Sequence, residues 1–380
     1  MKLKYIIMGA VLLCGAASCV EDDTIILPDF QDVAGEEVDG ETPGISGRVA
    51  GFYVLNEGMM GLNKATIDYF DYVTARYARN IYPSRNPSVV MELGDTGNDI
   101  AVYGDRLYIV VNGSHKVEVC DAVTAERIGQ VDIDSPRCIV FEGNYAYVSS
   151  AVGGTGDNGS VVRINLSTLK ADATVSVGLM PEEMVVVDGR LYVANSQNYG
   201  VGRFDNTISV VDLASFTFDS SITVGVNLHH LRLDGQGNMW VNSRGNYYDE
   251  AANLYKLTRT GDTYGNPVAF DIDCTNFAIS GDKLYYYTSV YDANWNAVYT
   301  YGTIDTATGA IGGSFITDGT ASEITTPYCI AIQPYNGDIF ITDAKNYTSS
   351  GRLYCYNKAG ELKWSVTTGD LPGHIAFVER

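Results

Sequence analysis

One short cassette recurs along most of this chain, and its spacing restricts the fold more than any other feature. In the copy at residues 104–112, a Gly-Asp turn precedes Arg-Leu-Tyr, a run of β-branched residues and Asn112. The aromatic residues at this place in all copies lie roughly 40 to 55 residues apart, a spacing typical of propeller blades. They are Tyr53, Tyr108, Tyr147, Tyr192, Trp240, Tyr285 and Phe340. Seven anchors predict an all-β fold, a seven-bladed β-propeller.

The links between strands predict that the two faces of the ring differ. The first link of each blade is short and carries Gly with Asn or Asp, the chemistry of tight hairpin turns, and the third link is also short. The second links are long and varied, at residues 151–160, 196–206, 244–253, 291–297 and 344–351. Binding residues commonly lie on loops held by a rigid scaffold. We therefore expect the long-loop face to be the binding face.

The end of the chain predicts how the ring closes. Residues 371–378 resemble the first strands of other blades, such as residues 135–141, whereas the cassette at Phe52 has no convincing strand before it. The C-terminal strand should therefore complete the first blade, which leaves the ring without open edges.

The N-terminal region predicts a membrane anchor. Residues 1–18 combine a basic start with an apolar stretch too short to span a bilayer, followed by small residues before Cys19. This pattern resembles a bacterial lipoprotein signal, in which Cys19 is lipidated; a simple secretory peptide ending near Ala17 is the alternative. Residues 19–46 are acidic and rich in Gly and Pro, which predicts a flexible tether, with the propeller at 47–380.

Charge and cysteine content narrow the classes of partner. The formal net charge of −21 argues against nucleic acid, anionic lipid headgroups or polyanionic sugars as the main partner, although it also serves solubility. Of seven cysteines, five lie outside the leader, and none forms a Cys-x-x-Cys pair. We expect buried free thiols rather than a disulfide framework.

Alignment of the first strands predicts a ring of side chains at the mouth of the central channel. The aligned residues are Asp99, Cys138, Glu183, His229, Asn276, Cys329 and His374. The residues before them are Asn98, Arg137, Glu182, Leu228, Thr275, Tyr328 and Gly373. Such donors could bind a metal, but only neighbours in a seven-membered ring lie close enough, and Cys329 and His374 are the one adjacent Cys/His pair. A hydrated polar mouth without a metal is the expectation.

Catalytic motifs are missing from the sequence. It contains no Gly-x-Ser-x-Gly, Walker loop or His-Glu-x-x-His. The pairs Glu182-Glu183 and His229-His230 could supply an acid and a base for a lyase-type enzyme, or they could be exposed polar loop residues. We expect a protein that is not an enzyme.

Binding chemistry is better supplied, because the long loops alternate aromatic residues with asparagines. Aromatic faces give a large contact area, and amides pair with neutral polar groups. This combination suits a large uncharged ligand that carries amides or hydroxyls. The predicted ligand-binding residues are Asn98, Asp99, Arg137, Glu182, Glu183, Tyr199, His229, Tyr247, Tyr248, Asn276, Trp295, Tyr328, Tyr347 and His374.

Several stretches resemble a known family. Residues 53–58, 63–71 and 97–100, together with the Leu-Tyr cassettes, resemble the YncE-like seven-bladed propeller lipoproteins of Bacteroidetes. Residues 80–99 are similar to the BtuG-type cobalamin-binding members, and the acidic residues 20–23 resemble the signal that exports such lipoproteins to the outer face of the outer membrane.

The resemblance implies a cell-surface lipoprotein that captures cobalamin (vitamin B12) and delivers it to a TonB-dependent outer-membrane transporter, with no cofactor of its own. If so, we expect His229 or His374 to lie close enough to hydrogen-bond the corrin or approach its cobalt. Alternatives are a propeller that binds a glycan or another nutrient, a lyase-type enzyme, and a purely protein-binding propeller.

Overall fold

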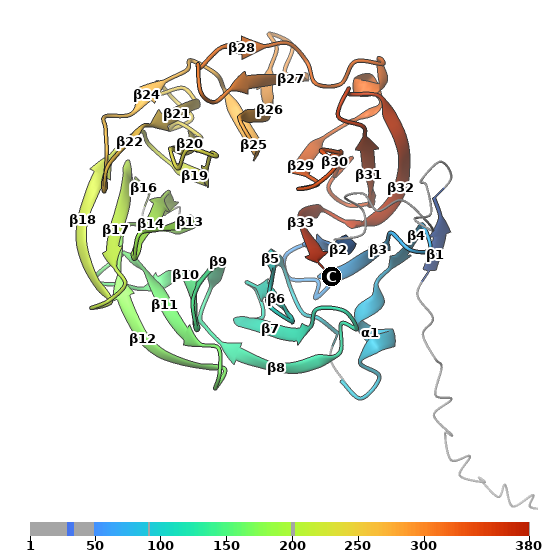
Figure 1. Ribbon diagram of the computed structural model, residues 1–380, viewed down its shortest axis with the longest axis horizontal. Coiled ribbons are helices and arrows are strands. Elements are labelled where there is room, and N and C mark those ends of the chain that lie inside the picture. Colours follow the sequence, from blue (N-terminus) through green and yellow to red (C-terminus); the bar gives the residue numbers. More distant parts are fainter. Residues whose placement is uncertain (1–28, 34–48, 90–91, 199–201, 380) are drawn as a thin grey trace, which may run out of the picture.

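The computed structural model is a ring of seven antiparallel sheets around a central axis (Figure 1). The structure describes residues 29–33, 49–89, 92–198 and 202–379. The predicted all-β, seven-bladed propeller is therefore confirmed. Residues 1–28, with Cys19, and residues 34–48 lie outside the described part, and so does Tyr199. Within the described ranges no helix is long and apolar enough to cross a membrane.

Each blade runs from strand a at the axis to strand d at the rim. Strands a of blades 1 to 7 are β33 (Pro372–Glu379), β5 (Gly97–Tyr103), β9 (Pro136–Glu142), β13 (Pro181–Val187), β19 (Leu228–Leu233), β25 (Cys274–Ser280) and β29 (Pro327–Ile332). Strands b are β2 (Val49–Asn56), β6 (Arg106–Val111), β10 (Tyr145–Gly153), β14 (Arg190–Asn195), β20 (Met239–Ser243), β26 (Lys283–Tyr291) and β30 (Ile339–Asp343).

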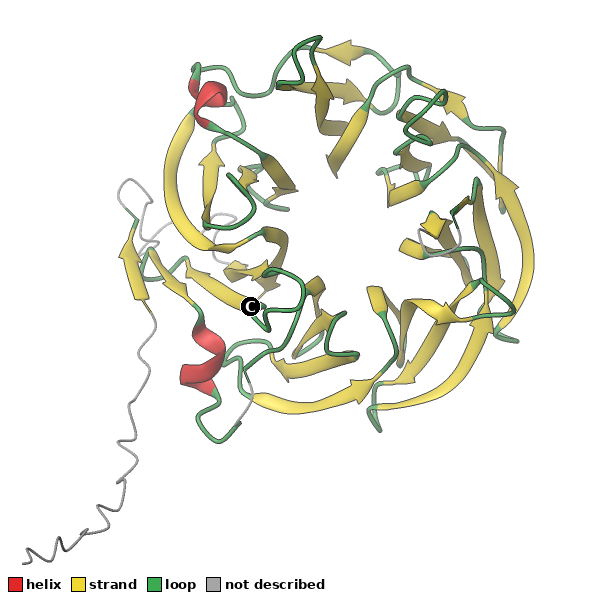
Figure 2. Cartoon of the chain, turned by 180° about the vertical axis from the view of Figure 1, so that it is seen from behind, coloured by secondary structure: helices red, strands yellow, loops and turns green. Residues whose placement is uncertain are grey.

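The outer strands complete the blades in the same order. Strands c are β3 (Thr66–Asp71), β7 (Lys116–Asp121), β11 (Gly159–Asn165), β17 (Thr207–Asp212), β21 (Asn253–Leu257), β27 (Ala297–Asp305) and β31 (Ser350–Tyr356). Strands d are β4 (Arg76–Arg79), β8 (Arg127–Asp132), β12 (Lys170–Ser176), β18 (Thr217–Thr223), β24 (Val268–Ala269), β28 (Ile311–Gly312) and β32 (Leu362–Asp370). The helical turns α1 (Ile81–Arg85) and η2 (Thr320–Glu323) lie on the outside of the ring (Figure 2).

The core lies between the blades, and the repeated cassette builds it. Leu107 packs into the cluster shared with blade 1, whereas Tyr108, the next residue, packs into the cluster shared with blade 3. Leu191 and Tyr192 divide in the same way between two clusters. Because successive side chains of a strand point to opposite faces, one Leu-Tyr pair joins a blade to both of its neighbours.

Closure occurs as predicted. Strand β33 from the C-terminus pairs antiparallel with β2, with Ile375 opposite Val54 and Phe377 opposite Phe52, so the last strand completes the first blade. Figure 1 shows the red β33 beside the blue β2. Phe52 and Phe340 then pack with ring centroids 4.9 Å apart across the seam between blades 1 and 7.

A short N-terminal strand adds a second fastening to this seam. Strand β1 (Asp29–Asp32) pairs with β4 as a fifth strand of blade 1. The Gln31 amide exchanges two hydrogen bonds, of 2.7 and 3.0 Å, with the backbone of Thr367 in blade 7. Residues 29–33 belong to the predicted tether 19–46, so that prediction is corrected for this segment. Main-chain pairing covers the edge of β4 without needing an apolar sequence.

The two faces differ as expected, with one exception. First and third links lie together: Ala122 N–H donates to Asp105 O in blade 2, and Leu213 N–H donates to Gly189 O in blade 4. In blade 5 the third link is not short, because it forms a hairpin of β22 (Arg259–Thr260) and β23 (Thr263–Tyr264). A second small hairpin, β15 (Gln197–Asn198) with β16 (Arg203–Phe204), lies in a predicted long loop.

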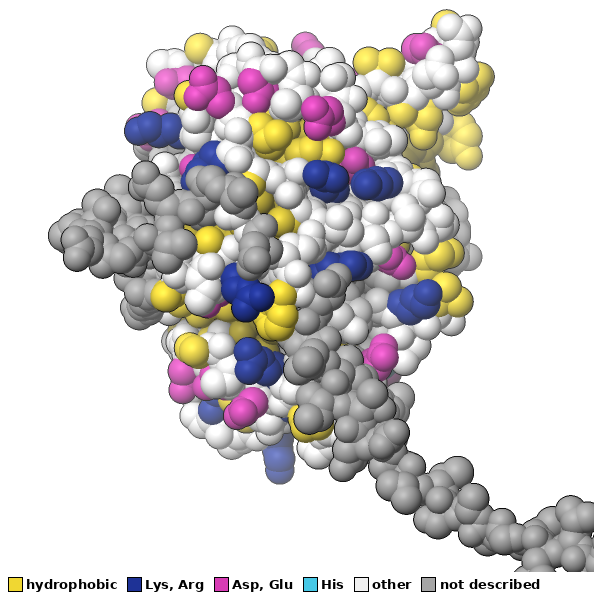
Figure 3. All heavy atoms as spheres, turned by 90° about the vertical axis from the view of Figure 1, so that its right-hand side faces the viewer, with side chains coloured by type: hydrophobic (Ala, Val, Ile, Leu, Met, Phe, Trp, Pro, Cys, Tyr) yellow, Lys and Arg dark blue, Asp and Glu magenta, His cyan; other side chains and the backbone are white. Residues whose placement is uncertain are grey.

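The outer side of the ring carries mixed charge. On the described surface seen in Figure 3, basic and acidic side chains are interspersed rather than gathered by sign. The cysteines Cys120, Cys138, Cys274, Cys329 and Cys355 are buried and free, as predicted. Neither observation points to a site on the outer side of the ring.

Candidate functional site at the mouth of the channel

An irregularity at the start of every strand a shapes the mouth. The pairing register between strands a and b shifts at the same place in all seven blades, for example between Gly97 and Asp99 and between Pro181 and Met184. A bulge of this kind bends a strand and changes where its side chains point. Consecutive residues, such as Glu182 and Glu183, consequently both line the channel.

The register defines two stacked rings of side chains. The inner ring is Asp99, Cys138, Glu183, His230, Asn276, Cys329 and His374, and the outer ring is Asn98, Arg137, Glu182, His229, Thr275, Tyr328 and Gly373. The prediction is wrong in blade 5, where His230 rather than His229 belongs to the inner ring. Leu231 pairs with Val241 as Ile100 pairs with Ile109, which places His229, not Leu228, in the outer ring.

Two cavities follow the axis. The outer cavity has a volume of about 430 Å³ and is lined by the outer ring, by Glu57 and Arg244, and by loop residues that include Tyr299 and Tyr347. The inner cavity, of about 270 Å³, lies further along the channel. The two cavities share five lining residues, Glu183, His230, Asn276, Gly373 and His374.

A buried ion pair organises one side of the outer ring. The Arg137 guanidinium donates to both carboxylate oxygens of Glu182, at 2.9 and 2.7 Å, and to Asn98 Oδ1 at 2.9 Å. Arg244, from the loop after β20, lies 3.6 Å from the same carboxylate. The Glu182 side chain is 2% exposed, so these two cations, rather than water, are its charged surroundings.

Glycine in blade 1 admits a carboxyl group from another strand. A Cβ atom on Gly373 would lie 2.2 Å from Glu57 Oε1, so only glycine leaves room for the Glu57 side chain in the outer ring. The Tyr328 hydroxyl donates to Glu57 Oε2 at 2.8 Å. Burial raises the pKa of Glu57 to about 7, against the opposing effects of the Tyr328 hydrogen bond and the Arg137 charge. Glu57 can therefore be neutral or ionised near neutral pH.

Glu183 in the inner ring is held as an anion. It accepts from His230 Nδ1 at 2.6 Å, from Arg232 Nη2 at 3.0 Å and from the Leu231 N–H at 3.0 Å. Burial would raise the pKa of Glu183, but the charges and hydrogen bonds of Arg232 and His230 outweigh burial and lower it. This carboxylate joins blade 4 to blade 5 and is saturated by its partners.

Asp99 and His374 form a second acid–imidazole pair. Their Oδ1 and Nδ1 atoms lie 3.6 Å apart, and Asp99 accepts the N–H groups of Ile100 and Ile139. Burial raises the pKa of Asp99 to about 7 and lowers the pKa of His374 to about 4. His374 is therefore a neutral imidazole at pH 7, which can hydrogen-bond or bind a metal but carries no charge.

His229 is neutral as well. Burial lowers its pKa well below the usual range, and the neighbouring charges of His230, Arg244 and Arg137 act in the same direction. Its ring lies 4.0 Å from that of His230, centroid to centroid. Across the described ranges, no group of three or more His, Cys, Asp or Glu residues could hold a metal ion. The adjacent pair Cys329 and His374 thus has no third ligand of these types.

The structure brings most of the predicted site residues together. Asn98, Arg137, Glu182, Glu183, His229, Asn276, Tyr328, Tyr347 and His374 line the outer cavity, and Asp99 lines the inner one. Tyr247, Tyr248 and Trp295 do not line either cavity and are largely exposed on the long loops. With Tyr291 and Tyr347 they form the aromatic rim, defined by these five residues, which comes from three consecutive blades, 5 to 7.

Some lining residues were not predicted. Glu57 and Arg244 each follow directly after a strand b, where the sequence gives no strand position to align. Their signal is weak: Glu57 follows the first cassette at Asn56, and Arg244 follows the cassette of blade 5 at Ser243. The gap left by Gly373 could have indicated that another side chain fills the outer ring.

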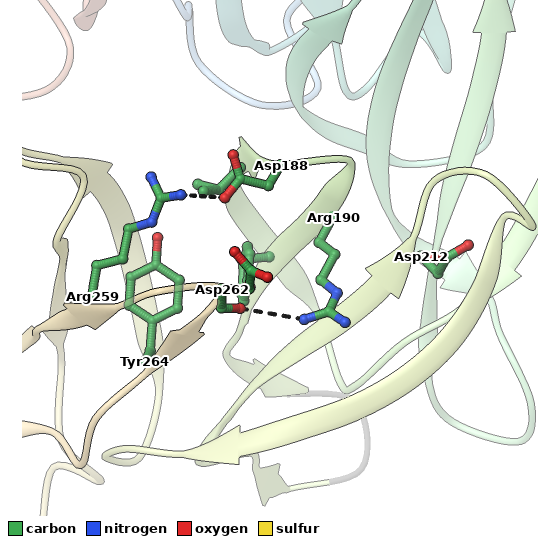
Figure 4. A pocket seen from close by; sticks show the side chains of 8 residues that line it. Asp188, Arg190, Asp212, Arg259, Asp262 and Tyr264 are labelled. Carbon is green, nitrogen blue, oxygen red and sulfur yellow. Dashed lines mark hydrogen bonds and ion pairs between the residues drawn. The ribbon is translucent and has the colours of Figure 1, made fainter.

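A second polar pocket lies on the short-turn face, at the seam between blades 4 and 5 (Figure 4). This seam pocket has a volume of about 280 Å³ and is closed by the hairpin β22–β23. Arg259 forms an ion pair with Asp188, and Arg190 donates to the Asp262 carbonyl at 3.4 Å. Tyr264 packs edge-on against Tyr192. The pocket joins the hairpin to blade 4.

Comparison with known proteins bears mainly on the fold. A family model described as a domain of unknown function, DUF5074, matches residues 50–371. No curated protein matches the chain. Similar solved structures include a quinonprotein alcohol dehydrogenase-like protein from Bacteroides thetaiotaomicron, at 14% identity over 87% of this chain and 78% of that one, with a TM-score of 0.64.

Two further solved structures are also similar in fold at low sequence identity. A candidate 6-phosphogluconolactonase from Bacteroides fragilis is 13% identical over 89% of this chain and 100% of that one, with a TM-score of 0.60. Hydrazine synthase from Kuenenia stuttgartiensis is 17% identical over 68% and 76%, with a TM-score of 0.56. At such identities the likeness shows the propeller fold alone.

Proposed function

The chain belongs to the DUF5074 family, and from this premise we propose that it is a non-enzymatic binding protein that captures cobalamin or a related corrinoid at the channel mouth. The observation that carries the proposal is the combination of a preformed polar cavity with the aromatic rim on the long loops of blades 5 to 7, of which Tyr347 lines the cavity. Exposed aromatic side chains gathered on consecutive loops are typical of a binding surface.

The dimensions of the mouth favour a ligand that rests on the rim. A corrinoid is larger than a cavity of about 430 Å³, so only one part of it can enter. The flat macrocycle would lie against the rim, where Trp295 is 82% and Tyr248 is 90% exposed. Amide side chains of the ligand would reach the outer ring, where Asn98 and neutral His229 offer hydrogen bonds.

Rigidity of the scaffold supports capture at low concentration. Strand a of each blade contacts strand a of both neighbouring blades and the ring is closed, so a ligand meets side chains that are already ordered. In the proposed function the captured corrinoid is passed to a TonB-dependent outer-membrane transporter. A lipid on Cys19 would hold the protein at the outer face of the outer membrane.

The experiment is isothermal titration of the full chain with cyanocobalamin. Trp295→Ala and Tyr347→Ala should each raise Kd at least about tenfold, the loss expected of a central aromatic anchor. Phe218→Ala is the matched control, because Phe218 is an exposed aromatic on β18, the outermost strand of blade 4, away from the mouth. No binding by the unaltered chain would refute the proposal.

Two additional variants test its parts. His229→Ala with His374→Ala tests whether an imidazole contacts the corrin or its cobalt, and unchanged affinity would exclude that contact. Cys19→Ala should release the protein from membranes during fractionation. If this variant still pelleted with membranes, lipid anchoring at Cys19 would be wrong.

A lyase-type enzyme is the second candidate, favoured by the pair Asp99 and His374 at the cavity wall. A carboxyl group whose pKa lies near 7, beside a neutral imidazole, is suited to proton transfer. This candidate predicts turnover of a bound substrate that is abolished by His374→Ala. Binding of cyanocobalamin without chemical change favours the first candidate.

A further inference from the structure

The outer ring gathers cations in an acidic chain. The formal net charge of the sequence is −21, yet Arg137 and Arg244 both face the outer cavity and share one close carboxylate, Glu182. The other carboxyl group in the outer ring, Glu57, is neutral in part of the molecules at pH 7 because burial raises its pKa to about 7. The two arginine charges therefore face the carboxylate of Glu182 and, in part of the molecules, that of Glu57.

Arg244 has a hydrogen-bond donor to spare. Its Nη2 atom donates to Ser196 Oγ at 2.7 Å and lies 3.6 Å from Glu182 Oε1. Its Nε atom is buried, and in the described part of the chain it has no hydrogen-bond partner. Arg137, by contrast, is committed to Glu182 and Asn98. Since Nε is enclosed by protein atoms, a ligand in the cavity would meet the outer part of the Arg244 guanidinium; this side chain is 29% exposed, and its hydrogen bonds to the described residues all come from Nη2.

We propose that Arg244, supported by the charge of Arg137, forms a subsite for one oxyanion, a phosphate or carboxylate group carried by the ligand. This inference rests on the proposed function in that it concerns the same mouth. Guanidinium groups bind such oxygens with short, charge-assisted hydrogen bonds. Thr275 and Ser289 line the same cavity and supply hydroxyl donors.

Competing charges do not cancel the subsite. Glu183 is neutralised by Arg232 on the inner side, and His229 and His374 are uncharged at pH 7. The remaining acidic residues of the chain act from a distance, and physiological salt screens such charges beyond about 8 Å. Local geometry therefore decides whether an anion binds, although the overall negative charge slows its approach.

The test uses titration of the full chain with inorganic phosphate and, separately, with acetate, which distinguishes the two sources of an oxyanion. We expect one of them to bind, and Arg244→Gln to weaken that binding at least about tenfold. Arg203→Gln is the matched control, since Arg203 is an exposed arginine in a long loop that pairs with Asp157. The subsite is wrong if neither anion binds the unaltered chain, or if Arg244→Gln binds as tightly.

One further variant controls for misfolding, and one further comparison distinguishes failure of the subsite from failure of corrinoid capture. If Arg244→Gln lowers the melting temperature markedly, Arg244→Lys keeps the charge and should retain part of the binding; complete loss in a folded Lys variant would contradict the subsite. Arg244-dependent phosphate binding without cyanocobalamin binding would leave the subsite standing and refute corrinoid capture. If the unaltered chain and Arg244→Gln bound cyanocobalamin equally and neither bound an anion, the subsite would be wrong and corrinoid capture would stand.

Discussion

Two pockets of this propeller contain an arginine–carboxylate pair, and the two pairs differ in burial. At the mouth, Arg137 grips Glu182, whose side chain is 2% exposed. In the seam pocket, Arg259 pairs with Asp188, whose side chain is 53% exposed. Water solvates Asp188 whether or not Arg259 is present, whereas Glu182 has only protein partners to replace the water it has lost.

The propeller is built from similar blades, and the side chains suited to binding lie where the blades differ. The blades repeat the same turns and interblade contacts on the short-turn face, where the seam pocket fastens one hairpin. At the mouth each blade contributes a different pair of side chains at the same two positions. Buried polar groups there are ordered before any ligand arrives, which is the preorganisation that a binding site needs.

Removal of the arginine from each pair should give the largest difference in unfolding free energy between the two pockets. Arg137→Met leaves Glu182 buried with Arg244 at 3.6 Å as its remaining cation, and the expected loss in unfolding free energy is about 3 to 5 kcal/mol. Urea denaturation of both proteins measures the loss. Arg137→Met with Glu182→Met should recover much of the stability. A loss below about 1 kcal/mol for Arg137→Met would mean that the buried pair is no different from a surface pair.

The dependence of stability on pH should also separate the two pockets. The folded pKa of Glu57, about 7, lies above its ordinary value of 4.5, so ionisation destabilises the fold: the stabilising effect of the neutral form is complete below about pH 4.5 and is lost as pH rises through 7. The loss is up to about 3 kcal/mol. Arg137, Tyr328 and Cys329 are the titratable groups that face Glu57.

Glu57→Gln should therefore remove this loss, and the stability of the unaltered protein relative to the variant should fall by up to about 3 kcal/mol between pH 4.5 and pH 8. Asp99, whose pKa is raised, and His229 and His374, whose pKa values are lowered, titrate in both proteins, so the difference between the two curves isolates Glu57. In the seam pocket the sign is opposite: hydrogen bonds from Ser215 lower the pKa of Asp212, whose contribution is lost only as pH falls below its ordinary value of 3.8. Thermal melting across this pH range is the measurement, and identical curves for both proteins would contradict the assignment of Glu57.

A smaller effect on unfolding free energy is expected when a glycine at each pocket is replaced by alanine. Gly373→Ala places a Cβ atom 2.2 Å from Glu57 Oε1, so Glu57 must leave the outer ring and lose its bond from Tyr328, at a cost of about 2 kcal/mol. Gly189→Ala, in the turn beside Asp188, meets no atom within 4 Å and costs about 1 kcal/mol through its positive φ alone. Ligand affinity should fall for Gly373→Ala and stay unchanged for Gly189→Ala.

Most of the fold could be predicted from the sequence because it is periodic. The spacing of Tyr108 and its six counterparts sets the number of blades, and the likeness of residues 371–378 to other first strands reveals the closure. Strand β1 could not be predicted in this way, since its pairing with β4 depends on main-chain groups and on the single amide of Gln31.

The site was less predictable because it depends on departures from the repeat. Alignment found twelve of the fourteen ring positions, but the turn between the paired residues Leu233 and Met239 in blade 5 is one residue longer than the turn between Val102 and Leu107 in blade 2. Counting back from the cassette therefore placed His229 in the inner ring, where His230 lies. Glu57 and Arg244 follow the ends of strands, where a repeat pattern no longer fixes the register. Their place in the cavity comes from tertiary packing that one sequence does not display.

The smallest effect is expected at the seam pocket. Arg259→Gln removes the ion pair with Asp188, and both partners can be solvated by water, so unfolding free energy should fall by no more than about 1 kcal/mol. Salt screens exposed pairs, so the difference between Arg259→Gln and the unaltered protein should shrink at high ionic strength, while the loss in Arg137→Met should persist. Urea denaturation at low and high salt measures both. A loss at Arg259 as large as that at Arg137, insensitive to salt, would show that the hairpin β22–β23 and not the mouth holds the more tightly coupled charge.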